Sequence, residues 1–327
     1  MAPGPAEGVG IMPRTERFAV GSIDCQIVPD GVAMYEPDGF AVGVPAGQIR
    51  AALTARAQDN GQFAFPYNCL LIRAGGRLAL VDTGMGGEAA RRFGEPAGRL
   101  MVSLAASGIT AGQVEVVIIS HAHLDHIGGL TVATGAGRVP VFARARHYLW
   151  QAEWDFWTSE PGLAQVPREL ADAARTHLPP LHYAGLVELA SEETDVLPGV
   201  RLLPAPGHTA GHLVVALTSG KDGALYLGDA VLDEANFAHP GWVSEVEWNP
   251  GMAVATRTAL IEKAIAENRL LIAPHLAARG YAERAADHYR LRHGAPRYQQ
   301  PDNSRAAAGG SRRQPRIRVH RPPPAAW

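Results

Sequence analysis

The chain of 327 residues predicts an α/β protein, an αββα sandwich in which two mixed β-sheets pack face to face and helices cover their outer sides. Two observations favour this class. Strand-like apolar runs are interspersed with helical segments, and this order occurs twice, once in each half of the chain. The composition, 46% hydrophobic and 19% charged, is that of a folded globular protein rather than a disordered one.

The first half opens with an alternating run, RFAVGSIDCQIVPDG, which predicts a strand that ends in a Pro-Asp-Gly turn. Residues 46–58 are expected to be helical, and YNCLLIRAGGRLALVDTG predicts a hairpin with Gly-Gly at its turn. An apolar-periodic helix is expected over 98–107. Thr110 and Gln113 then match a capping box. The run VEVVIIS is typical of a buried strand.

The second half repeats the pattern. RVPVFA predicts a strand and ARHYLWQAEWDFWTS a helix, which begins a helical, proline-containing insertion over about 145–185. GVRLLPAPG, HLVVALTS and GALYLGDA predict three strands. GMAVATRTALIEKAIAENR predicts a helix, LLIAPH a strand, and YAERAADHYRLR a final helix.

The sequence predicts one folded domain with two less ordered ends. We expect a loose N-terminal extension over 1–17, the folded domain over 18–295, and a basic, Pro- and Arg-rich tail over 296–327. After Gln300 the tail carries six arginines and one aspartate, a net charge of +5, so the overall charge of −2 leaves −7 elsewhere. Such a tail can bind nucleic acid or anionic membrane. Its low apolar content and lack of periodicity favour a disordered end.

Cysteine usage and the absence of targeting signals favour the cytoplasm. Cys25 and Cys69 lie far apart in apolar runs, which is typical of buried strand residues rather than of a disulfide or a cysteine metal site. The start of the chain lacks a signal-peptide pattern, and we find no apolar run of membrane-spanning length.

The stretch SHAHLDHIGG follows the strand VEVVIIS directly, and loops at strand ends commonly carry chemistry on a rigid scaffold. It places four metal-preferring side chains within six positions, and three more residues of this kind each follow an apolar run. The set is His121, His123, Asp125, His126, His208, Asp229 and His275. Divalent ions such as Zn²⁺ bind imidazole nitrogen and carboxylate oxygen.

The spacing of these residues predicts two ions rather than one. In an extended stretch His121 and His123 point to the same side, so both can bind one ion. Asp125 and His126 lie past the bend and can reach a second ion. Seven ligands exceed the need of one ion and suit two ions that share a carboxylate. The small residues Gly128 and Gly129 are expected to let the chain turn and start a helix close to the metals.

The motifs HAHLDH, PGHTAGH, GDA, PH and DTG together resemble those of metallo-β-lactamase-fold hydrolases, over about residues 18–290. The resemblance implies the αββα sandwich with the metals at one edge between the sheets. It implies the following ligands: His121, His123 and His208 for one ion, Asp125, His126 and His275 for the other, and Asp229 bridging. It also implies that Asp82 orients a ligand histidine. The alternatives are that Asp82 is a turn residue, and that His212 either supports the site or simply begins a strand.

The resemblance implies a metal-dependent hydrolase with two divalent ions, Zn²⁺ being expected and Mn, Fe or Co being the alternatives. Two ions about 3.5–4 Å apart can bridge a water and lower its pKa toward about 7, which gives a hydroxide nucleophile. Asp125 is expected to pass a proton to the leaving group as well as to bind metal. The chain has no GxSxG motif, so we expect no covalent enzyme intermediate.

In layout the chain is similar to the quorum-quenching N-acyl homoserine lactonases and to the methyl-parathion-hydrolase-like enzymes. A lactonase that opens lactones or related esters is one expectation, and an organophosphate triester or aryl ester hydrolase is the alternative. Many lactonases carry a tyrosine where this chain has Leu232, three residues after Asp229, and the DFW sequence at 155–157 looks more like the second group. A β-lactamase, a catalytically silent small-molecule binder and an iron-based redox protein are further alternatives.

Aromatic residues suggest a substrate pocket. We expect Phe65, Trp157, Leu232 and Trp242 to contribute to an acyl or aryl pocket over the metals. Trp150, Trp154 and Trp157 recur at helical spacing, and core packing or a homodimer interface is the favoured alternative for them. The expected partner is a small-molecule substrate, with no membrane partner. The net negative charge of the chain outside its tail disfavours nucleic acid as a binding partner.

Overall fold

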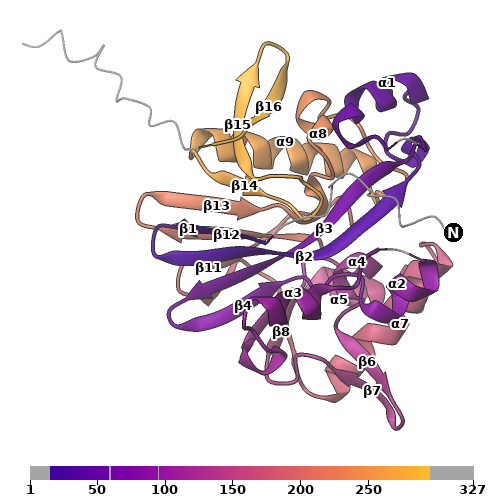
Figure 1. The fold of residues 1–327 in the computed structure, drawn as a ribbon, viewed down its shortest axis with the longest axis vertical. Helices are drawn as coiled ribbons and strands as arrows, with labels where there is room; N and C mark the ends of the chain where they lie inside the picture. The colour runs from indigo at the N-terminus through magenta and orange to yellow at the C-terminus, as the bar shows by residue number, and fades with distance from the viewer. Residues whose placement is uncertain (1–14, 59, 95, 295–327) are drawn as a thin grey trace, which may run out of the picture. The chain divides into compact units, whose positions relative to one another are not determined.

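A computed structural model describes residues 15–58, 60–94 and 96–294, which lie within one compact unit. The predicted basic tail over 296–327 and most of the predicted N-terminal extension over 1–17 lie outside the described residues. The described residues form two seven-stranded mixed sheets with helices outside them (Figure 1), so the predicted αββα sandwich is confirmed.

The first sheet is built from the first 190 residues. Its strands, in spatial order, are β1 (Glu16–Val20), β2 (Ile23–Tyr35), β3 (Phe63–Ala74), β4 (Arg77–Val81), β5 (Val116–Ile118), β8 (Arg146–Trp150) and β9 (Val187–Ala190). The first four pair antiparallel, whereas β4, β5, β8 and β9 are parallel neighbours. The β3–β4 hairpin turns at Gly75 and Gly76, as predicted.

The second sheet follows from residue 194 onward. Its strands, in spatial order, are β10 (Thr194–Leu197), β11 (Val200–Pro204), β12 (Leu213–Ser219), β13 (Asp222–Tyr226), β14 (Leu270–Ile272), β15 (Gly280–Ala285) and β16 (His288–Arg292). Only β13 and β14 pair in parallel within it. A separate hairpin joins β6 (Thr131–Thr134) to β7 (Gly137–Pro140), so the strand predicted at RVPVFA is present but outside both sheets.

The helices lie on the two outer faces. They are α1 (Ala46–Ala52), α2 (Gly87–Phe93), α3 (Leu100–Ala106), α4 (Leu124–Ile127), α5 (Gln151–Trp157), α6 (Glu160–Leu163), α7 (Arg168–Tyr183), α8 (Ala235–Ala238) and α9 (Pro250–Ala266). In Figure 1, α9 lies along β14 on one side, and α3, α4, α5 and α7 gather on the other. Short 3-10 turns occur at Pro37–Gly39, Thr54–Arg56, Ala111–Gln113 and Gly228–Ala230. The capping box of Thr110 and Gln113 is present at the third of these.

Three apolar clusters hold these layers together. Ile72 of the first sheet and Val215 of the second belong to the cluster between the sheets. Leu71, adjacent to Ile72 on β3, points the other way and belongs to a second cluster, which includes Leu178 of α7. Leu225 packs with residues of α9 in the third cluster. Because β3 is covered on both faces, its sequence is a continuous apolar run rather than an alternating one.

The Pro-Asp-Gly sequence at 29–31 does not form the predicted turn. Strand β2 continues through it, with a bulge between Pro29 and Gly31 opposite β3. The prediction was wrong because the Asp30 carboxylate accepts hydrogen bonds from backbone N–H groups distant in sequence rather than from those of its own turn. It accepts N–H bonds from Met85, Gly98 and Leu100 at 2.9, 3.0 and 2.8 Å.

Residues 145–159 were predicted as one helix, but the first part is strand β8 and the helix α5 begins at Gln151. His147 and Leu149 are buried while Tyr148 and Trp150 are half-buried, a period of two that suits a strand between β5 and β9. Trp150 therefore does not share a helical stripe with Trp154.

The final helix predicted over 281–292 is instead the hairpin of β15 and β16. Alanine and charged residues favour a helix by propensity alone. Pairing of β15 with β14, and cross-strand ion pairs, outweigh that preference. Glu283 contacts Arg290 and Arg292 across the hairpin at 2.9 and 2.6 Å.

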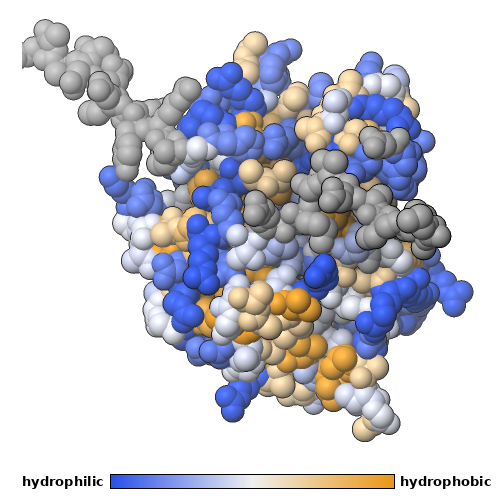
Figure 2. Space-filling view, viewed as in Figure 1, coloured by the Kyte–Doolittle hydropathy of each residue, from blue (hydrophilic) through white to orange (hydrophobic). Residues whose placement is uncertain are grey.

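Within the described residues no helix is long and apolar enough to cross a membrane. Figure 2 shows apolar side chains gathered over the region of α3 in this view. Two exposed apolar residues of α3 are Met101 and Val102, 40% and 60% exposed. This surface is distinct from the residues that line the site described next.

Candidate metal centre

The topology brings the carboxyl ends of several strands to one edge of the sandwich. Strands β4, β5 and β8 are parallel neighbours in the first sheet, as are β13 and β14 in the second. His121 to His126 follow β5, Asp229 follows β13, and His275 follows β14. His208 lies in the loop between β11 and β12. All seven predicted ligand residues are therefore brought together, in two groups that share Asp229.

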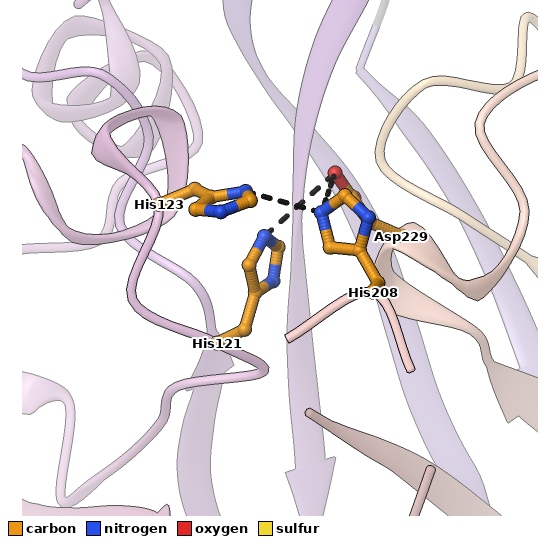
Figure 3. A group of neighbouring side chains, drawn as sticks. All are labelled: His121, His123, His208 and Asp229. Carbon is orange, nitrogen blue, oxygen red and sulfur yellow. Dashed lines mark hydrogen bonds and ion pairs between the residues drawn. The ribbon is translucent and has the colours of Figure 1, made fainter. Parts of the chain in front are cut away.

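The first group comprises His121, His123, His208 and Asp229, whose ligand atoms all lie within 4.8 Å of one another. In Figure 3 the three imidazoles and the carboxylate converge on one point from separate segments of the chain. Nε2 of His208 lies 3.1 Å from Nδ1 of His123 and 3.4 Å from Oδ2 of Asp229. Nε2 of His121 lies 3.8 Å from the same oxygen.

The second group comprises Asp125, His126, His275 and Asp229. Nε2 of His126 lies 3.4 Å from Oδ1 of Asp229 and 3.4 Å from Oδ2 of Asp125. Nε2 of His275 lies 3.2 Å from Oδ1 of Asp229 and 3.5 Å from Oδ2 of Asp125. One oxygen of Asp229 thus faces each group, which is the arrangement required of a bridging carboxylate.

The residues present fit two divalent ions. Nε2 of His121, Nε2 of His126 and Oδ1 of Asp229 are buried and accept or donate no hydrogen bond within the described residues. Buried polar atoms normally have hydrogen-bond partners, so these three atoms, which lie among the ligand atoms of the two groups, fit coordination to bound ions. Tetrahedral zinc with bonds of about 2.0–2.1 Å separates its ligand atoms by roughly 3.3 Å, close to the distances found here.

The histidines are oriented by hydrogen bonds on the side away from the site. Nδ1 of His126 lies 3.0 Å from Oδ2 of Asp82, and Nδ1 of His121 lies 3.0 Å from Oγ of Ser120. Nδ1 of His275 lies 2.9 Å from the carbonyl oxygen of Pro66. Such partners fix the ring orientation and the tautomer of a metal ligand. The structure therefore gives Asp82 the orienting position that the sequence suggested.

His208 is oriented by a buried ion pair that the sequence did not reveal. Oε2 of Glu247 lies 3.0 Å from Nδ1 of His208, and Oε1 of Glu247 accepts a 3.2 Å bond from Arg257. Both Glu247 and Arg257 have side chains with no exposed surface. Glu247 lies in an irregular loop before α9, where no periodicity marks it as buried.

His212 supports the site rather than binding metal in either group. Its Nε2 accepts a 3.0 Å bond from the backbone N–H of Asp229, which fixes the start of the segment that carries the bridging carboxylate. His212 directly precedes β12, which begins at Leu213.

Burial and neighbouring charges set the protonation of the ligand residues. Burial lowers the pKa of His121 well below its ordinary value and that of His123 to about 3, so both imidazoles are neutral and ready to bind metal. Burial acts the same way on His126, but the carboxylates of Asp125 and Asp229 outweigh it and raise its pKa. The pKa of Asp229 is lowered because its histidine neighbours outweigh the effect of burial.

Gly128 and Gly129 act by close packing, not by starting a helix as predicted. Helix α4 precedes them and has Gly128 as its C-terminal cap. A Cβ on Gly128 would lie 1.9 Å from the carbonyl oxygen of Met85, and one on Gly129 would lie 2.1 Å from that of Thr83. The glycines therefore let the stretch that carries His121 to His126 pack against the segment after β4.

A cavity of about 560 Å³ lies over the two ligand groups. His123, Asp125, Asp229 and His275 contribute to its lining. Its other lining residues are mostly aromatic, aliphatic or acidic: Tyr35, Glu36, Asp38, Gly39, Phe40, Phe65, Tyr67, Leu170, Leu232, Ser244, Glu245 and Val246. Phe65 and Leu232 thus lie where the sequence predicted.

The two predicted pocket tryptophans do not line this cavity. Trp157 is 1% exposed, its indole N–H donates to Glu153, and its ring edge packs 5.6 Å from the ring of His123, centroid to centroid. Trp242 stacks on His239 and contacts Phe40 from behind, at centroid distances of 4.1 and 6.5 Å. Both residues support lining side chains instead of meeting a ligand.

The fold and the site together define a protein with two candidate metal sites at one edge of an αββα sandwich. A model of the metallo-beta-lactamase superfamily matches residues 63–317, and the chain belongs to that superfamily.

Several curated proteins and solved structures are similar to the chain. It is 32% identical to a hydroxyacylglutathione hydrolase of Alkalilimnicola ehrlichii over 170 residues, 52% of this chain but only 48% of that relative. It is 27% identical to an N-acyl homoserine lactonase of Bacillus cereus over 213 residues, 59% of this chain and 76% of the lactonase.

Among solved structures, the hydrolase AbOPH superposes with a TM-score of 0.75 at 24% identity, covering 88% of this chain and 98% of that one. The dizinc quorum-quenching lactonase AidC gives 0.73 at 23% identity, covering 88% and 99%. These structural likenesses establish the shared fold.

Proposed function

We propose that the protein is a dinuclear metal-dependent hydrolase that opens a lactone, or cleaves a related ester, with an apolar acyl group. The observation that carries this proposal is the position of the two ligand groups at the 560 Å³ cavity, where Asp125 and Asp229 are lining residues beside Phe65 and Leu232. The likeness to an N-acyl homoserine lactonase over 213 residues supports it.

Two bound divalent ions would supply an activated water and polarise the attacked oxygen. The chain itself supplies orientation and proton transfer. Asp125 has 20% of its side chain exposed, more than any other member of the second group, and it faces the cavity. This exposure supports a role for Asp125 in passing a proton to the leaving oxygen. Phe65 and Leu232 would hold the acyl group beside it.

The charge at the cavity favours an uncharged substrate. Glu36, Asp38 and Glu245 contribute carboxylates to the lining, and no lysine or arginine does so among the described residues. Carboxylates repel anionic ligands across a low-dielectric cavity. This supports a neutral lactone or ester over a glutathione conjugate or a nucleic acid as substrate.

An aryl ester or organophosphate triester is the second candidate substrate. Leu232 lies in the cavity wall and offers no hydroxyl at the position where many lactonases have a tyrosine. An aliphatic side chain there suits an aryl group as well as an acyl chain.

The test is proton release when a long-chain N-acyl homoserine lactone is added to zinc-loaded protein, with His121→Ala as control. Ring opening that requires His121 supports the lactonase. Protein that holds two ions but releases no proton is next tested with aryl esters and phosphotriesters, and turnover there supports the second candidate. Failure on all three substrate classes with both ions bound would overturn the hydrolase proposal in favour of a silent binder.

A further inference from the structure

Glu153 is a buried carboxylate close to the first ligand group, and no sequence motif marks it. It lies on α5 with no exposed surface. Four donors surround it. Oε1 accepts bonds from the N–H of Ala122 at 2.8 Å and the indole N–H of Trp157 at 2.7 Å. Oε2 accepts bonds from Oγ1 of Thr209 at 2.7 Å and the N–H of Gly211 at 2.8 Å.

These contacts join the two loops that carry the first ligand group. Ala122 lies between His121 and His123, whereas Thr209 and Gly211 follow His208 in the other loop. The His208 loop packs directly on α5, since a Cβ on Gly211 would lie 2.1 Å from the backbone nitrogen of Glu153. One carboxylate therefore bonds to the backbone of both loops, with one oxygen for each.

The donor set defines the charge of this side chain. An ionised carboxylate accepts about four hydrogen bonds and donates none, and Glu153 meets four donors. Burial raises the pKa of Glu153, and these four donors act in the opposite direction. A neutral amide in the same place would set its NH₂ group against at least one N–H donor. The loops are therefore matched to a carboxylate and not to an isosteric amide.

We propose that Glu153 is a positioning residue that fixes the His121–His123 loop against the His208 loop and thereby sets the affinity of the first ligand group for its ion. Its two bonds to the His208 loop and its one bond to Ala122 hold ligands from separate sheets at bonding distance. The second group takes Asp125 and His126 from helix α4, just past His123, and His275 from the loop after β14. The four hydrogen bonds of Glu153 reach neither α4 nor that loop. The effect is therefore selective for one of the two ions.

The test is the metal affinity of Glu153→Gln protein, measured by competition between the protein and a chromophoric zinc chelator. Partners that orient metal ligands typically contribute about 10–100-fold to metal affinity. We expect one ion to bind that much more weakly and the other to be unchanged. The His275→Ala background, in which the second group lacks a ligand, assigns the weakened ion. Two ions bound as tightly as in the wild type would overturn the proposal.

Two further variants separate the loop contacts from the packing of α5. Trp157→Phe removes one donor, leaves both loops bonded to Glu153 and keeps an aromatic ring beside His123, so we expect a smaller loss of affinity than in Glu153→Gln. Thr209→Val removes one bond to the His208 loop, and we expect the ion of the first ligand group to bind more weakly. If Trp157→Phe weakens the ion as much as Glu153→Gln does, packing and not loop positioning is responsible, and the proposal fails.

Thr209→Val also carries the test if circular dichroism shows that Glu153→Gln does not fold, since unchanged affinity in the folded valine variant would contradict the proposal. The readout is metal binding and not turnover. A wild-type protein that binds both ions but hydrolyses nothing would contradict the proposed function without affecting this result.

Discussion

Oδ2 of Asp82 lies 3.0 Å from Nδ1 of His126, and this contact directs Nε2 of His126 toward Asp229. The same aspartate accepts bonds from the N–H and the hydroxyl of Ser120 at 2.8 and 2.9 Å. Oγ of Ser120 in turn lies 3.0 Å from Nδ1 of His121. One carboxylate thus orients a histidine in each ligand group, directly in one and through a serine in the other.

Replacing Asp82 by asparagine should lower the affinity of the protein for both ions by about 10–100-fold. Asp82 has φ of 63°, in the left-handed region that asparagine also tolerates, so the backbone should be retained. The amide lacks the charge that holds the two imidazoles. Chelator competition measures the loss, and Asp195→Asn on the exposed face of β10 is the control. Wild-type affinity in the Asp82→Asn protein would show that Asp82 is only a turn residue.

Breaking the buried pair of Glu247 and Arg257 should destabilise the fold. Both side chains have no exposed surface, and their atoms lie 3.2 Å apart. Arg257→Ala leaves the buried carboxylate of Glu247 with His208 as its one remaining partner among the described residues, so the free energy of unfolding should fall by about 3–5 kcal/mol in urea titrations. Arg201→Ala breaks an exposed pair with Asp195, where both side chains are about half exposed, and should cost below about 1 kcal/mol. Equal losses in the two variants would contradict this account.

Metal affinity should fall as the pH falls. The pKa of His208 and His275 is raised because neighbouring carboxylates outweigh the effect of burial. A ligating imidazole must be deprotonated, so below a raised pKa each bound ion has to displace a proton. Each such proton weakens binding up to tenfold per pH unit, about 1.36 kcal/mol.

Chelator competition at several values between about pH 6 and 8 measures that slope, because this is the range in which histidines titrate. Release of protons into a weakly buffered solution when zinc is added gives an independent count. Affinity that is flat across the range, with no proton release, would mean that the ligand histidines are already neutral.

The ligand residues could be predicted from the sequence because they sit at the ends of apolar strands, and parallel strands bring such ends to one edge. The groups behind them could not. Glu153 and Glu247 are isolated acids whose partners are backbone N–H groups or a histidine 39 residues away, and no local pattern encodes those contacts. The hairpin of β15 and β16 differs from the predicted helix for a related reason, since its stability comes from pairing with β14 and from cross-strand ion pairs, which residue propensities do not encode.

Shortening a lining residue should change substrate selection, whereas shortening a supporting one should not. Leu232→Ala removes apolar surface from the cavity wall. If the protein is a hydrolase of long-chain substrates, kcat/KM for them should fall roughly 10- to 200-fold, equivalent to about 1–3 kcal/mol, with little change for a short acyl group. Trp242→Phe, which lies behind Phe40, is the matched control and should keep the wild-type ranking. A reversed pattern, with ranking altered only by Trp242→Phe, would place the acyl group outside the cavity.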